Sequence, residues 1–224
     1  MLRQSPEKIS FIVLVLFMIN FTLQRQKMIE TQLMARDITD SRVMTAFNQV
    51  CREEFVPQYL KNKAYSDFPL PIGQAQSISQ PYIVAKMCQL LELKGHEKVL
   101  DIGTGSGYAA AILSHLVNEV VSIERIEVLA KEARRRLRRL AYENIKVIIG
   151  DGLEGVVTEA PFEAIVAAAV TATIPQAWRD QLTIGGRIVV PLGTKHRQKL
   201  VRLTKTEQSF KQEEFDFVAF VPLI

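Results

Sequence analysis

Short apolar runs alternate with amphipathic segments along the second half of the chain. Runs rich in β-branched residues occur at residues 98–101, 119–124, 145–150, 163–169, 187–192, 200–205 and 214–224. Apolar residues with helical spacing fill 108–116 and 126–141, between the first three runs, and recur around 176–182. Strands that alternate with helices in this way predict parallel βαβ units. We therefore expect an α/β fold with a doubly wound, mostly parallel seven-stranded sheet. The last connections are too short for crossover helices, which predicts an antiparallel edge.

The segment ahead of this α/β pattern is largely helical. Residues 26–36 and 41–51 show helical spacing, and the second helix would begin at the polar residues Thr39 to Ser41. Proline and glycine interrupt residues 57–79, which are expected to be irregular, and a further helix follows at 81–93. No interdomain linker is apparent, so we expect N-terminal helices that belong to the sheet domain.

An uncharged apolar segment from Ile9 to Leu23 precedes these helices, with basic residues on both sides. Its 15 residues are fewer than the roughly 17 to 25 that span a bilayer, but they suit a signal peptide or a short anchor. Three hypotheses are open: a membrane-directed segment or uncleaved signal, a helix buried on the body, or an artefact of the start site, since Met28 could also begin the chain. We expect residues 1–24 to be a hydrophobic extension and residues 25–224 to form one domain.

Composition and charge narrow the class of protein. Of the 224 residues, 48% are apolar and 23% are charged, which excludes a disordered or collagen-like chain. The net charge of +4 is small for a nucleic-acid-binding protein, so no nucleic-acid partner is expected. The basic run at 131–139 is interpreted as a solvated helix face, with an RNA or acidic-lipid surface as the alternative. Cys51, Cys88 and three scattered histidines predict neither a disulfide framework nor a metal site.

A glycine-rich loop directly follows the first strand and opens a helix. Such a loop lets backbone N–H groups approach a ligand at the helix N-terminus. Its match to the relaxed dinucleotide motif is weak on its own, and Asp101 at the strand end would repel a pyrophosphate. The same carboxylate would attract the ammonium and sulfonium groups of S-adenosyl-L-methionine, which carries no phosphate. We therefore predict S-adenosyl-L-methionine as the cofactor, bound by Asp101, Gly103, Thr104, Gly105 and Gly107.

Two further acidic residues stand at the ends of the next strands. Glu124 ends the second strand, 23 residues after Asp101, where a carboxylate can accept hydrogen bonds from ribose hydroxyls. Asp151 and Gly152 follow the third strand and are expected to lie over the adenine. Carboxyl ends of parallel strands share one edge of a sheet, so these residues should line one crevice. The alternative is that Asp101 caps a helix, Glu124 is solvated and residues 150–152 are a simple turn.

A second polar segment, residues 69–82, lies between prolines just ahead of a helix. Two hypotheses are open for it. Ser79 could be the N-cap of the helix, with Pro81 in the first turn. The segment could instead be a substrate site, because binding residues often lie on such loops.

Several motifs resemble those of the protein-L-isoaspartate O-methyltransferase family. They are GQAQSISQPY, DIGTGSGY, SIER, GDG, GGRIVVPLG and the terminal FVPLI, in this order and spacing, and the match runs from about Gln26 to Ile224. The resemblance implies a Rossmann-like methyltransferase fold and methyl esterification, from S-adenosyl-L-methionine, of the side carboxylate of L-isoaspartyl residues in damaged proteins. It further implies Ser79 as the active-site serine, with Ser77 and Gln80 beside it in the substrate site.

The resemblance also implies a cytoplasmic enzyme, and we expect a monomer whose partners are isoaspartyl-containing proteins and peptides. Export or membrane contact through residues 9–23 is the alternative. Ala167–Val170 stands where the family usually carries a threonine, and Glu163 replaces a usual aspartate. These departures keep open a methyltransferase of the same fold acting on another carboxylate or a small molecule. A membrane-tethered module that only binds the cofactor is the non-enzymatic alternative.

Overall fold

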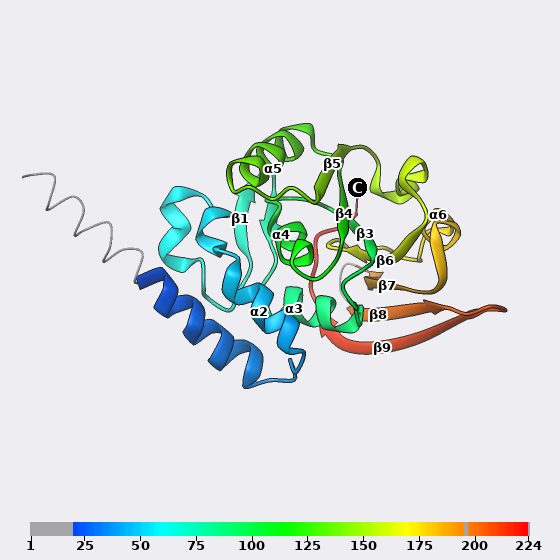
Figure 1. The fold of residues 1–224 in the computed structure, drawn as a ribbon, viewed down its shortest axis with the longest axis horizontal. Helices are drawn as coiled ribbons and strands as arrows, with labels where there is room; N and C mark the ends of the chain where they lie inside the picture. The colour runs from blue at the N-terminus through cyan, green and yellow to red at the C-terminus, as the bar shows by residue number, and fades with distance from the viewer. Residues whose placement is uncertain (1–19, 195–196, 224) are drawn as a thin grey trace, which may run out of the picture.

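A seven-stranded sheet forms the centre of the molecule in the computed structural model, which describes residues 20–194 and 197–223. The strand order is β5-β4-β3-β6-β7-β8-β9 (Figure 1). The first five strands in this order are parallel, whereas β8 and β9 are antiparallel to their neighbours. The strands are β3 (Lys98–Ile102), β4 (Glu119–Glu124), β5 (Ile145–Ile149), β6 (Phe162–Ala167), β7 (Leu182–Thr194), β8 (Arg197–Lys205) and β9 (Phe210–Val218). The predicted fold class, including its antiparallel edge, is confirmed.

The parallel strands are buried on both faces, as near-continuous apolar runs require. One face is covered by α3 (Pro81–Leu90), α4 (Tyr108–Ser114) and α5 (Glu127–Arg139), and α6 (Gln176–Asp180) packs on the other. Side chains alternate along β3, so Val99 packs with the first group of helices while Leu100 and Ile102 face the second core. This alternation places Asp101 on the side of α3 and α4.

The N-terminal helices pack on the same face as α3 and α4. Residues 20–28 are helical, and the helix continues as the π-helical turn η1 (Ile29–Met34). Next comes α2 (Ser41–Gln49), which begins at Asp40 because the side chain of Asp40 accepts a hydrogen bond from the Arg42 N–H, at 2.9 Å. Two short 3-10 turns follow, η2 (Arg52–Glu54) and η3 (Gln58–Lys63). In Figure 1 these blue and cyan elements lie together on one side of the sheet.

The described helices include none that is long and apolar enough to cross a membrane. Most of the predicted extension, residues 1–19, lies outside the described residues. Its last five residues, 20–24, belong to the first helix, whose Phe21 packs against the core. The folded body therefore includes residues on the N-terminal side of residue 25.

A small β-hairpin replaces the irregular structure expected before Ser79. Strands β1 (Leu70–Gly73) and β2 (Gln76–Ile78) are joined by Gln74 and Ala75, with φ of 52° and 55°. Two consecutive left-handed residues make a two-residue hairpin turn, which normally uses Asn-Gly. The sequence has Gln-Ala at this point and carries no such signal, so local pattern does not predict the hairpin. The Ile72 side chain packs over Gly105, so the hairpin covers the glycine loop.

The last strand lies earlier in the chain than the predicted range 214–224, because it begins at Phe210. Strand β9 ends at Val218, and residues 219–223, the C-terminal strap, turn back across the end of the sheet (Figure 1, red). The Gln198 side chain accepts a hydrogen bond from the Phe220 N–H and donates one to the Phe220 carbonyl. Val170 pairs with the strap through its N–H to the Val221 carbonyl and its own carbonyl to the Leu223 N–H. A proline at 222 cannot donate to a strand ladder, consistent with this departure from the sheet.

Candidate active site

Three adjoining pockets open at the carboxyl ends of β3, β4 and β6. The inner pocket lies between α3 and the glycine loop (residues 103–107) and is lined by Ser77, Ser79, Cys88, Asp101, Gly103, Thr104, Gly105 and Tyr108 among others. The acidic pocket beside it includes Ser77, Gly103, Gly105, Glu124, Gly152, Ala168 and Leu223. The outer pocket includes Pro69, Ser77, Ser79, Gln80, Ile83, Ala168, Phe217 and Val221. Ser77 therefore lines all three pockets, and Ser79 lines the inner and outer ones.

The glycine loop is held from behind by α5. Gly107 is the N-cap of α4 with φ of 87°, and a Cβ there would lie 3.3 Å from the Leu137 side chain. The Arg136 Nη1 donates a hydrogen bond to the Ser106 carbonyl at 2.7 Å. Gly107 itself does not line the pockets, so its role in this structure is the close approach of α5 to the loop.

Asp101 presents an unpaired carboxylate oxygen in the inner pocket. The residue is 1% exposed, and its Oδ2 accepts a hydrogen bond from the Ser122 Oγ at 2.7 Å. Its Oδ1 is buried and has no partner among the described residues. Burial raises the pKa of Asp101 to about 7, because few contacts stabilise the anion and Glu124 is also negative. An ammonium group would satisfy this oxygen, and the helix-cap alternative for Asp101 is wrong because the N-cap of α4 is Gly107.

Glu124 is held rigidly at the edge of the acidic pocket. Its Oε2 accepts the Gly105 N–H at 2.8 Å, and its Oε1 accepts the Ile126 N–H at 2.9 Å. At 7% exposure it is buried, so the solvated alternative is wrong. Each carboxylate oxygen can accept a second hydrogen bond, which leaves capacity for ribose hydroxyls.

The turn after β5 contributes its glycine to the acidic pocket. A Cβ on Gly152 would lie 2.6 Å from the Ile102 Cγ2, so the backbone can pass only without a side chain. The fully buried Trp178 donates from Nε1 to the Gly152 carbonyl at 2.7 Å. Asp151 does not line the pockets, and its Oδ1 accepts the Leu153 N–H at 2.9 Å as the cap of a short turn.

Ser79 lies one residue too early to cap α3. The N-cap of α3 is Gln80, whose side chain makes no capping bond, so the N-cap alternative for Ser79 is wrong. Within the part of the chain that the structure describes, the Ser79 hydroxyl has no hydrogen-bond partner. Gln80 lines the outer pocket and is fixed by donating to the Asp67 carbonyl at 3.0 Å.

The C-terminal strap is the largest part of the site that the sequence did not indicate. Its residues Val221 to Leu223 line the acidic pocket, and Ala219 to Val221 line the outer one. Ala168, from the stretch noted for its departure from the family, lines all three pockets. The described histidines, His96 and His115, line none of them. These two histidines therefore supply no imidazole base to Ser79, which a Ser-His hydrolase mechanism requires.

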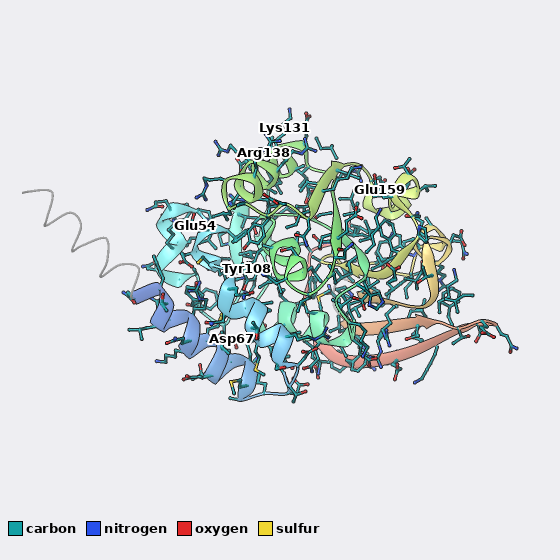
Figure 2. The ribbon with its side chains drawn as sticks, in the orientation of Figure 1. Glu54, Asp67, Tyr108, Lys131, Arg138 and Glu159 are labelled. Atoms are coloured by element: carbon teal, nitrogen blue, oxygen red, sulfur yellow. The ribbon has the colours of Figure 1, made fainter. Side chains whose placement is uncertain are left out.

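The basic run on α5 is partly taken up by contacts within the protein. Arg134 donates to the Val147 carbonyl on edge strand β5, and Arg139 pairs with Glu54. Lys131 pairs with Glu127 at 2.6 Å one helical turn away. Figure 2 shows Lys131 and Arg138 at the outer edge of the molecule, far from Tyr108 at its centre. The run thus combines a solvated face with structural arginines.

Comparison with known proteins settles the family. The family model of protein-L-isoaspartate(D-aspartate) O-methyltransferase matches residues 23–224. The chain belongs to this family. A protein-L-isoaspartate O-methyltransferase of Syntrophobacter fumaroxidans is 51% identical over 92% of this chain and 97% of its own. One of Methanoculleus marisnigri is 48% identical over 90% and 91%.

Solved structures agree with the fold. One of a protein-L-isoaspartate O-methyltransferase superposes with a TM-score of 0.81 at 29% identity, over 88% of this chain and 65% of its own length. A Plasmodium falciparum structure, described as a putative member in complex with S-adenosyl-L-homocysteine, gives a TM-score of 0.77 at 23% identity over 91% and 98%. The chain is an S-adenosyl-L-methionine-dependent enzyme that methylates L-isoaspartyl residues of damaged proteins, as the sequence motifs indicated.

Proposed function

We propose that the free carboxylate of an isoaspartyl residue binds at Ser79, where the inner and outer pockets meet. The observation that carries this proposal is the unpartnered hydroxyl of Ser79, a residue that lines both pockets and whose carbonyl accepts a hydrogen bond from Arg52. Ser77, at the junction of all three pockets, and Gln80, in the outer pocket, complete the substrate site. The outer pocket leads to solvent along Pro69 and Phe217, which leaves a path for the rest of a protein substrate.

The described side chains around the inner and acidic pockets suit the cofactor. The unpaired Oδ1 of Asp101 fits its ammonium group, and Glu124 has acceptor capacity for its ribose. Gly103, Thr104 and Gly105 supply the wall between these two groups, and Gly152 leaves room on the adenine side. When bound, S-adenosyl-L-methionine supplies a methyl group on a positively charged sulfur.

Methyl transfer to a carboxylate needs positioning more than acid–base chemistry. A carboxyl group with an ordinary pKa of about 3.9 is already ionised at neutral pH, so no general base is required. The Ser79 hydroxyl donates to one carboxylate oxygen and thereby directs the other toward the inner pocket. Holding both reactants at near-attack distance can contribute up to roughly 7 to 11 kcal/mol in favourable cases.

Cofactor affinity is expected to depend on pH through Asp101. Its pKa is raised to about 7, and only its charged form attracts a cationic ligand. Affinity should therefore fall by up to about tenfold per pH unit below pH 7 and level off at higher pH. Calorimetric titration of the wild-type protein and of Asp101→Asn over this range measures the effect. The same pH dependence of cofactor affinity in Asp101→Asn would show that Asp101 does not bind the cationic part of the cofactor.

We also propose that residues 1–19 determine where the protein is located and take no part in catalysis. A chain that starts at Asn20 keeps Phe21 and Arg25, whose Nη1 lies 2.9 Å from the Cys51 Sγ, and is expected to fold and retain full activity. A chain that starts at Met28 loses these contacts and should melt earlier. Membrane fractionation of the full chain and the Asn20 form tests the location. Inactivity or aggregation of the Asn20 form would show that the segment is part of the body.

A further inference from the structure

Arg52 is a fully buried arginine that lies directly behind the substrate serine. It belongs to η2, is 0% exposed and lines none of the three pockets. Its Nη2 donates to the Ser79 carbonyl at 2.8 Å, and its Nε donates to the Ala64 carbonyl at 2.7 Å. The guanidinium carbon lies 4.7 Å from the centre of the Tyr108 ring, which lines the inner pocket. Figure 2 shows Tyr108 at the centre of the molecule, between the N-terminal helices and the sheet.

The charge of Arg52 is not neutralised by a neighbouring carboxylate. Among the described residues it forms no salt bridge, and its Nη1 is buried without a hydrogen-bond partner. Its partners are two carbonyl oxygens and the face of an aromatic ring. A buried cation with such partners is costly to desolvate, so stability alone is a poor reason for its presence.

The two pockets next to Ser79 have no other positive side chain of their own. In residues 20–194 and 197–223, no lysine or arginine lines the inner or the outer pocket. Asp101 in the inner pocket is acidic and repels an anionic substrate when charged. Arg52 is bonded to the Ser79 backbone, and its charge acts through the low-dielectric protein interior, where a charge acts more strongly than in water.

We propose that Arg52 is a positioning residue for the substrate, which selects a charged carboxylate at Ser79 and holds the backbone of that serine in place. The proposal rests on the role proposed above for Ser79. It assigns the preference for an anion to a side chain that never touches the substrate. An amide or an ester at the same position would gain nothing from this charge.

The test compares the binding of two peptides with S-adenosyl-L-homocysteine present, so that no sulfonium charge contributes. One is an isoaspartyl peptide, and the other is the same peptide with its free carboxylate converted to a carboxamide. The wild-type protein should bind the carboxylate at least about tenfold more tightly. Equal binding of the two peptides by the wild-type protein would overturn the proposal without any variant.

Two substitutions then separate charge from shape. Arg52→Lys keeps the charge and should keep the preference for the carboxylate, whereas Arg52→Gln removes the charge and should reduce that preference about tenfold. Arg134→Gln is the matched control, because Arg134 also donates to a carbonyl but lies at the edge strand away from the pockets, and it should change nothing. If Arg52→Gln weakens the binding of both peptides equally, Arg52 is only structural and the proposal fails. If Arg52→Gln does not fold, equal binding of the two peptides by the wild-type protein, or loss of the carboxylate preference in a folded Arg52→Lys protein, still overturns the proposal.

The outcomes distinguish the proposal for Arg52 from the proposals for the substrate and for Ser79, on which it rests. Failure of the wild-type protein to methylate the isoaspartyl peptide would refute the proposed substrate chemistry at this site. An unchanged kcat in Ser79→Ala would remove Ser79 from the site and with it the basis for Arg52. With Ser79 supported, the ratio of the two peptide affinities in the Arg52 variants reports on Arg52 alone.

Discussion

Replacing Ser79 by alanine is expected to lower kcat for an isoaspartyl peptide by about 10- to 100-fold, because a hydrogen bond to a charged group contributes about 1.5 to 3 kcal/mol. The effect should fall on turnover, since the hydroxyl orients the carboxylate toward the reacting methyl. Cofactor affinity should change little because Asp101 and Glu124, which suit the cofactor, keep their own contacts. Steady-state kinetics and calorimetric titration of the same preparation measure both quantities.

The fold gives this experiment a clear control. Because Ser79 does not cap α3, whose N-cap position is Gln80, loss of the Ser79 hydroxyl should leave the free energy of unfolding within about 0.5 kcal/mol of the wild type. Ser41→Ala, at an exposed helix start on α2, is the matched substitution and should leave turnover unchanged. Wild-type turnover in a folded Ser79→Ala protein would contradict the substrate site proposed here.

Replacing Glu124 by glutamine is expected to weaken S-adenosyl-L-methionine binding by about 10- to 100-fold, since charge-assisted hydrogen bonds to ribose are lost. Loss of hydrogen bonds within the protein is a second cause of weaker binding. The two carboxylate oxygens accept the N–H groups of Gly105 and Ile126, and a glutamine NH2 would face one of these donors. The glycine loop should therefore lose part of its support as well.

Calorimetric titration with the cofactor measures the loss, and thermal melting reports the effect on the loop. Glu143→Gln is the matched control, because Glu143 is exposed and has no salt bridge among the described residues. Unchanged affinity in a folded Glu124→Gln protein would remove Glu124 from the cofactor site.

The parts of the fold that depend on local pattern could be predicted from the sequence. Short runs rich in β-branched residues located β3 to β6, because strands buried on both faces are apolar along their length, and helical spacing located the helices between them. Asp101 and Glu124 could also be placed, since the carboxyl ends of parallel strands meet at one edge. Asp101 was predicted to attract the cationic groups of the cofactor, and this role stays a prediction, although its Oδ1 has no partner among the described residues.

Features that depend on distant contacts could not be predicted. The β1–β2 hairpin turns at Gln74 and Ala75, which lack a turn signature, and is explained by its packing on Gly105. The C-terminal strap has the composition of a strand and is diverted by the Gln198 side chain and the Val170 backbone. Nothing local distinguishes Arg52 from a surface arginine, because its partner Ser79 is 27 residues away. Predicted site residues Gly107 and Asp151 lie near the crevice without lining it.

The most direct test of the account is transfer of a labelled methyl group from S-adenosyl-L-methionine to a synthetic isoaspartyl peptide, measured beside the same peptide with a normal aspartyl residue. With a free carboxylate bound at Ser79 and its peptide leaving through the outer pocket, label is expected in the isoaspartyl peptide and little or none in the aspartyl isomer. Ser79→Ala should lose most of the label. Equal labelling of the two peptides, or no labelling of either by a protein that binds the cofactor, would contradict the account.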